Sequence, residues 1–436
     1  MITMPPVARL RPLTVAACAC LIPIFFVPVL GGVDVNGVAA ILLALVAASF
    51  APQILRRPEI VAFVIAPWLI FITLCVAAEV LLGTRTSLGG VVPQGLFLCA
   101  SVGLAFGLSE IARLPRPETK LMSIALTMAV SMTAFLLVTA PLENLLSMLQ
   151  NLGNPITAVW HARRVFAPDS FVAGVSVENL ASYQNRIAQH LFAYAMIIAS
   201  LALLAVERGA QRGWRFYTCI AFAIFLCVVG IVFLSGQVLA QIFITSLFCG
   251  AALAIYRTSY RLLSATLAIA LAGVLALPAL LRSTVFINWY ARFTGGNVST
   301  GRFDRWDAYL SEFSMETLLL GTARVNEIDP HNALITALFE AGLLAFLAVL
   351  IFFLFVLFYA VWVVRRAALG GLSLLLMLST GPQIAFTMLI GGGWGMPGLA
   401  EWMKFSLFVF GMLIYGPKFS LTRERARLSH TVDTRA

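Results

Sequence analysis

Long apolar runs separated by short polar segments dominate the chain. About twelve of these runs approach or exceed the roughly 20 residues that a helix needs to cross a bilayer. They cover residues 13–30, 38–55, 60–82, 91–111, 121–140, 187–206, 214–234, 238–256, 262–281, 333–364, 372–390 and 402–415. The run at 333–364 is longer than one crossing needs, so we expect it to tilt or to extend past the membrane. The pattern predicts an all-α polytopic membrane protein with about twelve transmembrane helices, forming a single integral membrane domain over 1–436.

Composition excludes an ordinary soluble protein. Hydrophobic residues make up 61% of the chain and charged residues 11%, with a mean hydropathy of +0.96. Soluble domains contain about 25% charged residues. The formal net charge is +10, but Lys and Arg gather in short segments between apolar runs, which membrane topology alone explains. We therefore predict no nucleic-acid partner.

The distribution of Lys and Arg predicts the orientation. The basic segments are Arg9 with Arg11, Arg56 with Arg57, Arg113 to Lys120, Arg208 to Arg215, Arg257 with Arg261, Arg365 with Arg366, and the tail 418–436. They alternate with segments poor in positive charge, and positive loops stay in the cytoplasm. Both termini are thus expected in the cytoplasm, and the long loops 141–186 and 282–331 on the outer, periplasmic side. No small-residue cleavage site precedes Asp34, so the first run is expected to remain as the first span.

No metal or cofactor is expected. The cysteines all lie inside apolar runs: Cys18, Cys20, Cys75, Cys99, Cys219, Cys227 and Cys249. Disulfides and thiolate metal sites are therefore not predicted. The nearest pair of acids for a divalent ion, Asp304 and Asp307, is interleaved with Arg302 and Arg305. Arginine itself can neutralise a phosphate group, because its guanidinium is always charged and matches phosphate oxygens in a bidentate geometry.

The segment 302–345 concentrates polar and charged residues just before the longest apolar run. Asp329 and Pro330 have the form of a helix start, since Asp can cap free N–H groups and Pro is favoured in the first turn. His331 would then lie in that first turn. The positive end of the helix dipole disfavours imidazolium there, although Asp329 acts in the opposite direction. His331 is our candidate general base; taken alone, it is equally an interfacial polar residue.

Residues 302–317 have an amphipathic pattern that distinguishes two arginines. At 100° per residue, the apolar arc consists of Phe303, Trp306, Leu310 and Phe313, and Arg302 lies at its edge. Arg305 falls instead on a polar flank with Glu312 and Glu316. We expect Arg302 to face the protein body and Arg305 to pair with its acidic neighbours. The alternative for Arg302 is a rim arginine whose stem lies along the helix.

Asn332, Thr336 and Glu340 recur every four residues, so they share one face of the predicted helix. This row indicates either the wall of a polar cavity or a seam of interhelical hydrogen bonds. A carboxylate inside a span is costly, which favours a functional role for Glu340.

Several of these residues together resemble a known family. Arg302 with Trp306 four later, Gly321, His331-Asn332, Gly342 and then a small Ala345 are similar to the signature of the O-antigen ligase and O-antigen polymerase superfamily of bacterial envelope glycosyltransferases. The chain departs from that pattern twice. Ala345 stands where Gly is frequent, and Ser235-Gly236-Gln237 stands where some members have Ser-Arg-Gly.

The resemblance implies a second set of residues in the other long loop. Asn185 and Arg186, at the mouth of the 187–206 span, are similar to a position where relatives hold the donor pyrophosphate, and His190 follows one turn later. The alternative for Arg186 is an end-of-helix arginine reaching the interface. His161, Arg163, Arg164 and the glycine-rich segment 391–395 are weaker candidates without an assigned role.

The resemblance also implies an activity and a location. The expected enzyme is a multi-pass glycosyltransferase of the bacterial inner membrane with a periplasmic active site. It would transfer a glycan from undecaprenyl pyrophosphate to an acceptor hydroxyl such as that of the lipid A core, with inversion and without a metal. His331 and Arg302 would be catalytic, and Arg186, Asn332, Arg305, Asn185 and Glu340 would bind substrate. Its partners would be the lipid-linked donor, the acceptor and membrane lipids.

Two other functions stay open at the level of sequence. A repeat-unit polymerase of O-antigen or exopolysaccharide shares the same motif and chemistry with a ligase. A polysaccharide transporter is compatible with about twelve spans, but transporters place ionisable residues at mid-membrane. The distinctive charges of this chain lie in loop segments, which favours the enzyme.

Overall fold

The computed structural model describes residues 29–30, 33–82, 88–139, 146, 150, 177–230, 236–256, 260–261, 264, 266–268, 271, 306–308, 311, 314–321, 332–366, 371–390 and 402–414. Most of the first and ninth predicted spans, most of the two long loops and all of the tail 418–436 lie outside these residues.

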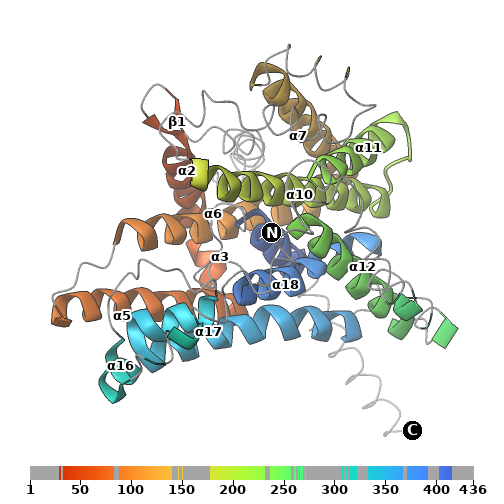
Figure 1. Cartoon of the computed structure of the whole chain (residues 1–436). Helices are drawn as coiled ribbons and strands as arrows, with labels where there is room; N and C mark the ends of the chain where they lie inside the picture. Colours follow the sequence, from red (N-terminus) through yellow and green to blue (C-terminus); the bar gives the residue numbers. More distant parts are fainter. Residues whose placement is uncertain are drawn as a thin grey trace, which may run out of the picture.

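The remaining ten apolar runs form helices (Figure 1). They are α2 (Val35–Ser49) with α3 (Ala51–Leu55), then α4 (Pro58–Ile60), η3 (Val61–Ile65) and α5 (Ala66–Leu82), α6 (Leu88–Arg113), α7 (Pro117–Thr139), α10 (Val177–Glu207), α11 (Trp214–Val229), α12 (Gly236–Tyr256), α17 (Ala333–Arg366), α18 (Leu372–Ile390) and a final helix, Trp402–Ile414. A short helix, α16 (Met315–Leu320), precedes α17. In the described part of the chain, strands occur only in a small antiparallel hairpin, β1 (Val29–Leu30) with β2 (Val33–Asp34).

Five of the described helices contain segments long and apolar enough to cross a membrane. These segments are Pro58–Ala77, Gly95–Arg113, Gln189–Glu207, Ala333–Val364 and Leu372–Leu389. Shorter apolar helices are Trp214–Val228, Ala240–Ala254 and Trp402–Ile414. Helices of this length and hydropathy are compatible with the multi-pass membrane protein that the sequence predicts. The count of about twelve spans stays a prediction.

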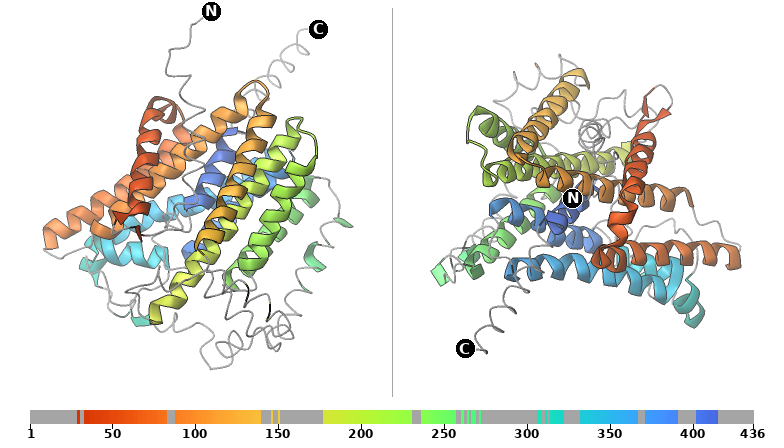
Figure 2. Two further views of the ribbon diagram at one scale, coloured as in Figure 1. Left: turned by 90° about the horizontal axis from the view of Figure 1, so that it is seen from above. Right: turned by 180° about the vertical axis from the view of Figure 1, so that it is seen from behind.

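Helix α18 lies at the centre of the bundle. It packs against α10 and α12 on one side and α17 on another, and α17 packs in turn against α5 (Figure 1, Figure 2). Helix α10 also contacts α7 and α11, while α2 packs on α6. The final helix is buried along its whole length. The core therefore runs through α18 and the final helix, and the other helices surround them.

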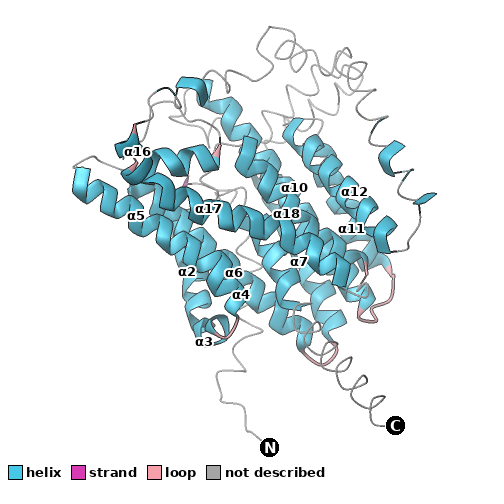
Figure 3. Ribbon diagram, turned by 90° about the horizontal axis from the view of Figure 1, so that it is seen from below, coloured by secondary structure: helices cyan, strands magenta, loops and turns pink. Residues whose placement is uncertain are grey.

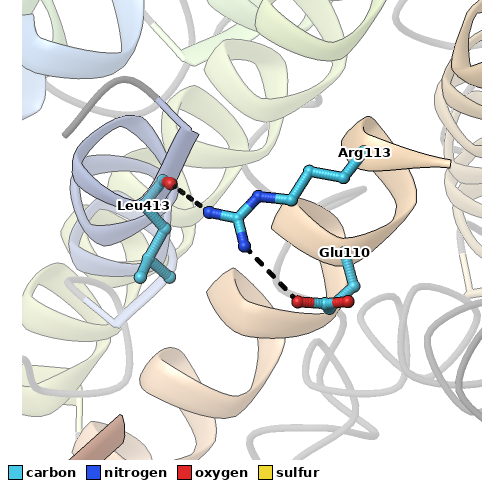
Figure 4. Close-up of polar contacts among 3 residues, drawn as sticks. All are labelled: Glu110, Arg113 and Leu413. Carbon is cyan, nitrogen blue, oxygen red and sulfur yellow. Dashed lines mark hydrogen bonds and ion pairs between the residues drawn. The ribbon is translucent and has the colours of Figure 1, made fainter. Parts of the chain in front are cut away.

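One end of the bundle carries the short turns and the arginines near them. Glu207, at the end of α10, accepts a hydrogen bond from the Ser373 backbone N–H at 2.9 Å and one from the Ser373 hydroxyl. Arg113, at the end of α6, donates to the Leu413 carbonyl at 2.8 Å and pairs with Glu110 at 3.5 Å (Figure 4). We call this end, with Arg56, Arg57, Arg113, Arg116 and Arg208, the basic end.

The helix α16 lies toward the opposite end of the molecule from α3 and α4, which lie at the basic end (Figure 3). The loop that joins α3 to α4 contains Arg56 and Arg57. The positive-inside rule predicts that the basic end is cytoplasmic. The end with α16 and the start of α17 would then be periplasmic, and this orientation stays a prediction.

Two prolines modify the helices that carry them. Pro67 lacks an N–H and cannot donate to the Phe63 carbonyl, and the wider π turn η3 (Val61–Ile65) lies directly before it. Pro382 lies inside α18 next to Gly381, where a side chain would come within 2.3 Å of the Val356 carbonyl oxygen. The glycine therefore allows α18 and α17 to approach closely.

Candidate functional site

The start of α17 is set by Asn332. The Asn332 side-chain oxygen accepts hydrogen bonds from the backbone N–H groups of Leu334 at 3.0 Å and Ile335 at 3.1 Å. This is the geometry of an N-cap. The prediction that Asp329 caps the helix and that His331 lies in its first turn is therefore wrong. The helix begins at Ala333, and position 331 immediately precedes the cap; His331 itself lies outside the described residues.

Asn332 also connects two helices at this end of the bundle. Its side-chain nitrogen donates to the Leu389 carbonyl, near the end of α18, at 3.4 Å. Its backbone carbonyl accepts a hydrogen bond from the Thr336 hydroxyl at 2.9 Å. The residue is buried. Asn332 is therefore held from several directions.

The long helix α17 is broken at Gly342, which has φ 80° and ψ −171°. The expected continuous helix is therefore a half-helix, from Ala333 to Gly342, followed by a longer one. The end of α16 packs against this break. A side chain at Gly342 would come within 2.3 Å of the Leu319 carbonyl oxygen, and one at Gly321, also at positive φ, within 2.5 Å of the Glu340 carbonyl oxygen. The two glycines let the backbones meet.

This glycine contact has a consequence for the segment 322–331. The segment begins after Gly321, which touches the last turn of the half-helix, and ends at Asn332, which caps its first turn. The residues that flank the segment, Gly321 and Asn332, are thus both held by the same short helix. Gly321 and Gly342 both belong to the signature of the resemblance. Their packing against the opposite element gives a physical reason for glycine at these two positions.

Glu340 lies in the last turn of the half-helix, and its side chain is buried. Thr336, one turn earlier, is half-buried, and its hydroxyl donates a hydrogen bond to the Asn332 backbone carbonyl. The predicted row of Asn332, Thr336 and Glu340 thus points inward. It agrees with either a cavity wall or an interhelical seam, the two alternatives that the sequence left open.

The helix expected over 302–317 is interrupted. Residues 306–308 are helical and Ser314 is not, so α16 is a separate element that begins at Met315. Within the first part, Trp306 is half-buried while Asp307 is exposed, which agrees with the predicted apolar arc. Glu316 belongs to the second element and cannot share a continuous face with Arg305. Arg302 and Arg305 lie outside the described residues.

Asn185 and Arg186 lie inside α10, which begins at Val177, and not at the mouth of a helix. The expected helix start at 187 was wrong because the ten preceding residues, although more polar, continue the same helix. The backbone of these two residues is described, but their side chains are not. His190 follows Arg186 by one helical turn, and its side chain is buried.

Lys404 is a buried cation that the sequence analysis missed. Its side chain is 0% exposed although it belongs to the final apolar helix, and it lies near His190 of α10. Lys404 precedes Leu413, at the basic end, by nine residues, or about 14 Å along a helix. This is roughly half the thickness of a hydrocarbon core. A lysine inside the apolar run 402–415 was the available signal.

A further polar seam joins α12 and α18. The Gln383 side-chain amide donates to the Thr245 hydroxyl, and the Thr245 hydroxyl donates to the Gln241 carbonyl at 2.8 Å. All three side chains are buried. Such contacts stabilise helix pairs in an apolar medium, so we assign this seam to packing.

The described residues contain no group of three or more His, Cys, Asp or Glu side chains placed to hold a metal ion. Comparisons of the chain with protein-family models, with curated proteins and with solved structures found no match.

Proposed function

We propose that this protein is a membrane glycosyltransferase that moves a glycan from undecaprenyl pyrophosphate to an acceptor hydroxyl, in the manner of an O-antigen ligase. The proposal combines the resemblance of the segment 302–345 with the geometry around α17. The observation that carries it is that the residues flanking the segment 322–331 are both held by the half-helix, since Gly321 packs against its last turn and Asn332 caps its first turn. Fixed flanking residues are suited to position catalytic groups between them.

Asn332 gives a physical reason for a base at position 331. The free N–H groups at the start of α17 create a positive potential there. A histidine directly before the cap is disfavoured as imidazolium and favoured as the neutral, proton-accepting form. His331 would remove the proton from the acceptor hydroxyl as that oxygen attacks the anomeric carbon.

The leaving pyrophosphate would be neutralised by Arg186 and Arg302. Arginine binds phosphate oxygens through two parallel hydrogen bonds and keeps its charge at any relevant pH. These contacts strengthen as the anomeric C–O bond breaks and negative charge develops on the pyrophosphate, which stabilises the transition state. A single displacement by the acceptor inverts the configuration of the anomeric carbon.

A transporter of polysaccharide is the second candidate, and a specific observation favours it. Lys404, His190 and Glu340 are buried inside the bundle, and α17 is broken near Glu340. Transporters combine broken helices with ionisable residues at mid-membrane. Ionisable residues therefore occur inside the bundle as well as in the segments between the apolar runs. The repeat-unit polymerase remains the alternative within the enzyme class.

The decisive experiment uses purified protein in liposomes with an undecaprenyl-pyrophosphate glycan, with and without a lipid A core acceptor. A ligase forms glycosylated lipid A only when the acceptor is present. A polymerase lengthens the lipid-linked chain without it. A transporter forms no new glycosidic bond but moves the glycan away from a glycosidase added outside.

His331→Ala is expected to abolish transfer while the protein still inserts and elutes as a single species. His430→Ala, in the basic tail, is the matched control and should keep its activity. Near wild-type turnover of His331→Ala would refute the assignment of the base.

The reaction should also continue in EDTA, because arginine is expected to neutralise the leaving group without a metal. A loss of activity that magnesium or manganese restores would show that arginine alone does not neutralise the leaving group.

A further inference from the structure

A pocket opens at the basic end, far from the glycine contact. Arg57 and Glu59 line it from the α3–α4 turn, Tyr359 and Trp362 from the end of α17, and Met412 and Leu413 from the final helix. Its volume is about 410 Å³ including the space open to solvent. The pocket thus combines one cation, one carboxylate and two aromatic rings.

The floor of this pocket is rigid. Met412 and Leu413 are buried, and the Leu413 carbonyl accepts the hydrogen bond from Arg113 that joins α6 to the final helix (Figure 4). Tyr359 and Trp362 pack against each other with ring centroids 5.6 Å apart. Phe63, from the turn after Glu59, stacks on Phe355 at 5.0 Å. The apolar and aromatic groups of the lining are therefore packed against the bundle.

The two charged groups at the rim remain accessible. Arg57 is half-buried and Glu59 is exposed. Within the described part of the chain, the Arg57 side chain makes no hydrogen bond or ion pair. The neighbouring Arg113, by contrast, forms an ion pair with Glu110 and donates a hydrogen bond to the Leu413 carbonyl. An arginine beside aromatic rings at a membrane boundary is suited to a lipid phosphate.

An apolar stripe on α17 leads to the pocket. Ile351, Leu354, Phe358 and Val361 are exposed and recur at intervals of three and four residues, so they share one face of the helix. Trp362, which lines the pocket, follows Phe358 by four residues and is 40% exposed. In a protein of this composition such a face borders acyl chains. A lipid lying along it would bring its headgroup to Arg57 and Glu59.

We propose that this pocket binds a phospholipid with a zwitterionic headgroup, as in phosphatidylethanolamine. Arg57 takes the phosphate, and the primary ammonium lies against Glu59 and the faces of Tyr359 and Trp362. Glu59 selects against phosphatidylglycerol, whose headgroup has no cation. Phosphatidylcholine fits less well, because its quaternary ammonium cannot donate a hydrogen bond to the carboxylate. This inference does not depend on the proposed glycosyl transfer.

The test measures lipid binding to the whole protein, purified in detergent and stripped of lipid. Native mass spectrometry compares phosphatidylethanolamine, phosphatidylglycerol and phosphatidylcholine with identical acyl chains. Wild-type protein should retain phosphatidylethanolamine in preference to the other two. Glu59→Gln should lose that preference by roughly tenfold, the loss of about 1.4 kcal/mol expected for one charge-assisted contact. Arg57→Gln should weaken the binding of all three lipids.

Arg56→Gln is the matched control, because Arg56 is exposed, adjacent in sequence and not part of the lining. It should bind phosphatidylethanolamine like the wild type. Each variant is first required to elute as one species with an unfolding temperature near that of the wild type. A wild-type protein without preference among the three lipids would overturn the proposal, as would equal losses in Arg56→Gln and Arg57→Gln.

Discussion

At the scale of single residues, Asn332 decides how the polar segment before α17 joins the bundle. Its amide accepts two backbone hydrogen bonds, donates one to Leu389 and is buried. Removing one partner of a buried hydrogen bond leaves the other unsatisfied, which costs more than an average hydrogen bond contributes. A change at Asn332 is therefore expected to affect both the stability of the half-helix and the position of residue 331.

Asn332→Ala removes the cap and should lower the free energy of unfolding by about 1 kcal/mol or somewhat more. Asn332→Asp keeps an oxygen that accepts from Leu334 and Ile335, and its charge is favoured at a helix start, so this variant should lose less. Thermal unfolding in detergent compares the two. Equal losses would show that the contact with Leu389, absent from both variants, outweighs the cap.

At the scale of elements, the packing of α16 against the break in α17 limits which residues the candidate site can contain. Gly321 and Gly342 both adopt positive φ, and each faces backbone atoms of the other element. A side chain at either position meets groups that cannot rotate away. The contact therefore requires glycine at both positions.

Gly342→Ala should destabilise the protein more than Gly209→Ala. Both glycines have positive φ, and Gly342, with ψ −171°, lies in a region that is essentially restricted to glycine. A side chain at Gly209 meets nothing within 4 Å, whereas one at Gly342 meets the Leu319 carbonyl. The difference between the two variants therefore measures this clash together with the backbone strain at Gly342. Unfolding temperatures measure it, and similar values for the two variants would mean that α16 moves aside at little cost.

The amphipathic part before α16 leads to a prediction about two arginines. If Arg302 binds pyrophosphate, Arg302→Lys keeps the charge but loses the bidentate contact, so turnover should fall roughly tenfold or somewhat more. Arg305→Lys should have a mild effect. Consumption of the lipid-linked donor by both variants is the measurement. A larger loss at Arg305 would show that the predicted apolar arc does not face the protein body.

At the scale of the whole molecule, the interior where α6, α10 and the final helix meet is polar as well as apolar. The Ser101 hydroxyl of α6 donates to the Trp402 carbonyl at 2.8 Å, and two residues later Lys404 lies near His190 of α10. A buried cation in an apolar bundle is costly, and such residues are typically functional. His190 in turn is one helical turn from Arg186.

Lys404→Met should reduce glycan transfer roughly tenfold per folded molecule, because it removes a buried positive charge near His190, which lies one helical turn from the predicted pyrophosphate ligand Arg186. Met403→Leu, a conservative change at the adjacent buried position, is the control and should transfer normally. Turnover is divided by the fraction of protein that elutes as a folded species. Normal turnover of Lys404→Met on that scale would assign Lys404 to packing.

The helical segments themselves were largely predictable from the sequence. The bounds of α18 agree with the predicted run 372–390, and α12 and α7 differ from theirs by a few residues at most. The reason is local, because the length and hydropathy of a run decide whether it can form an apolar helix. The start of α17 was predicted less well, since Asp329 and Asn332 are both good caps and only hydrogen-bond geometry distinguishes them.

Only the tertiary structure decided where helices break and which polar groups are buried. Gly342 lies within an apolar run that predicts one continuous helix, and the structure breaks the helix there, where the Leu319 carbonyl of α16 approaches the backbone. Lys404 belongs to a run that reads as a lipid-facing span, and its burial results from the packing of other helices around it. Both outcomes depend on contacts between residues distant in the chain, which hydropathy and helical periodicity do not contain.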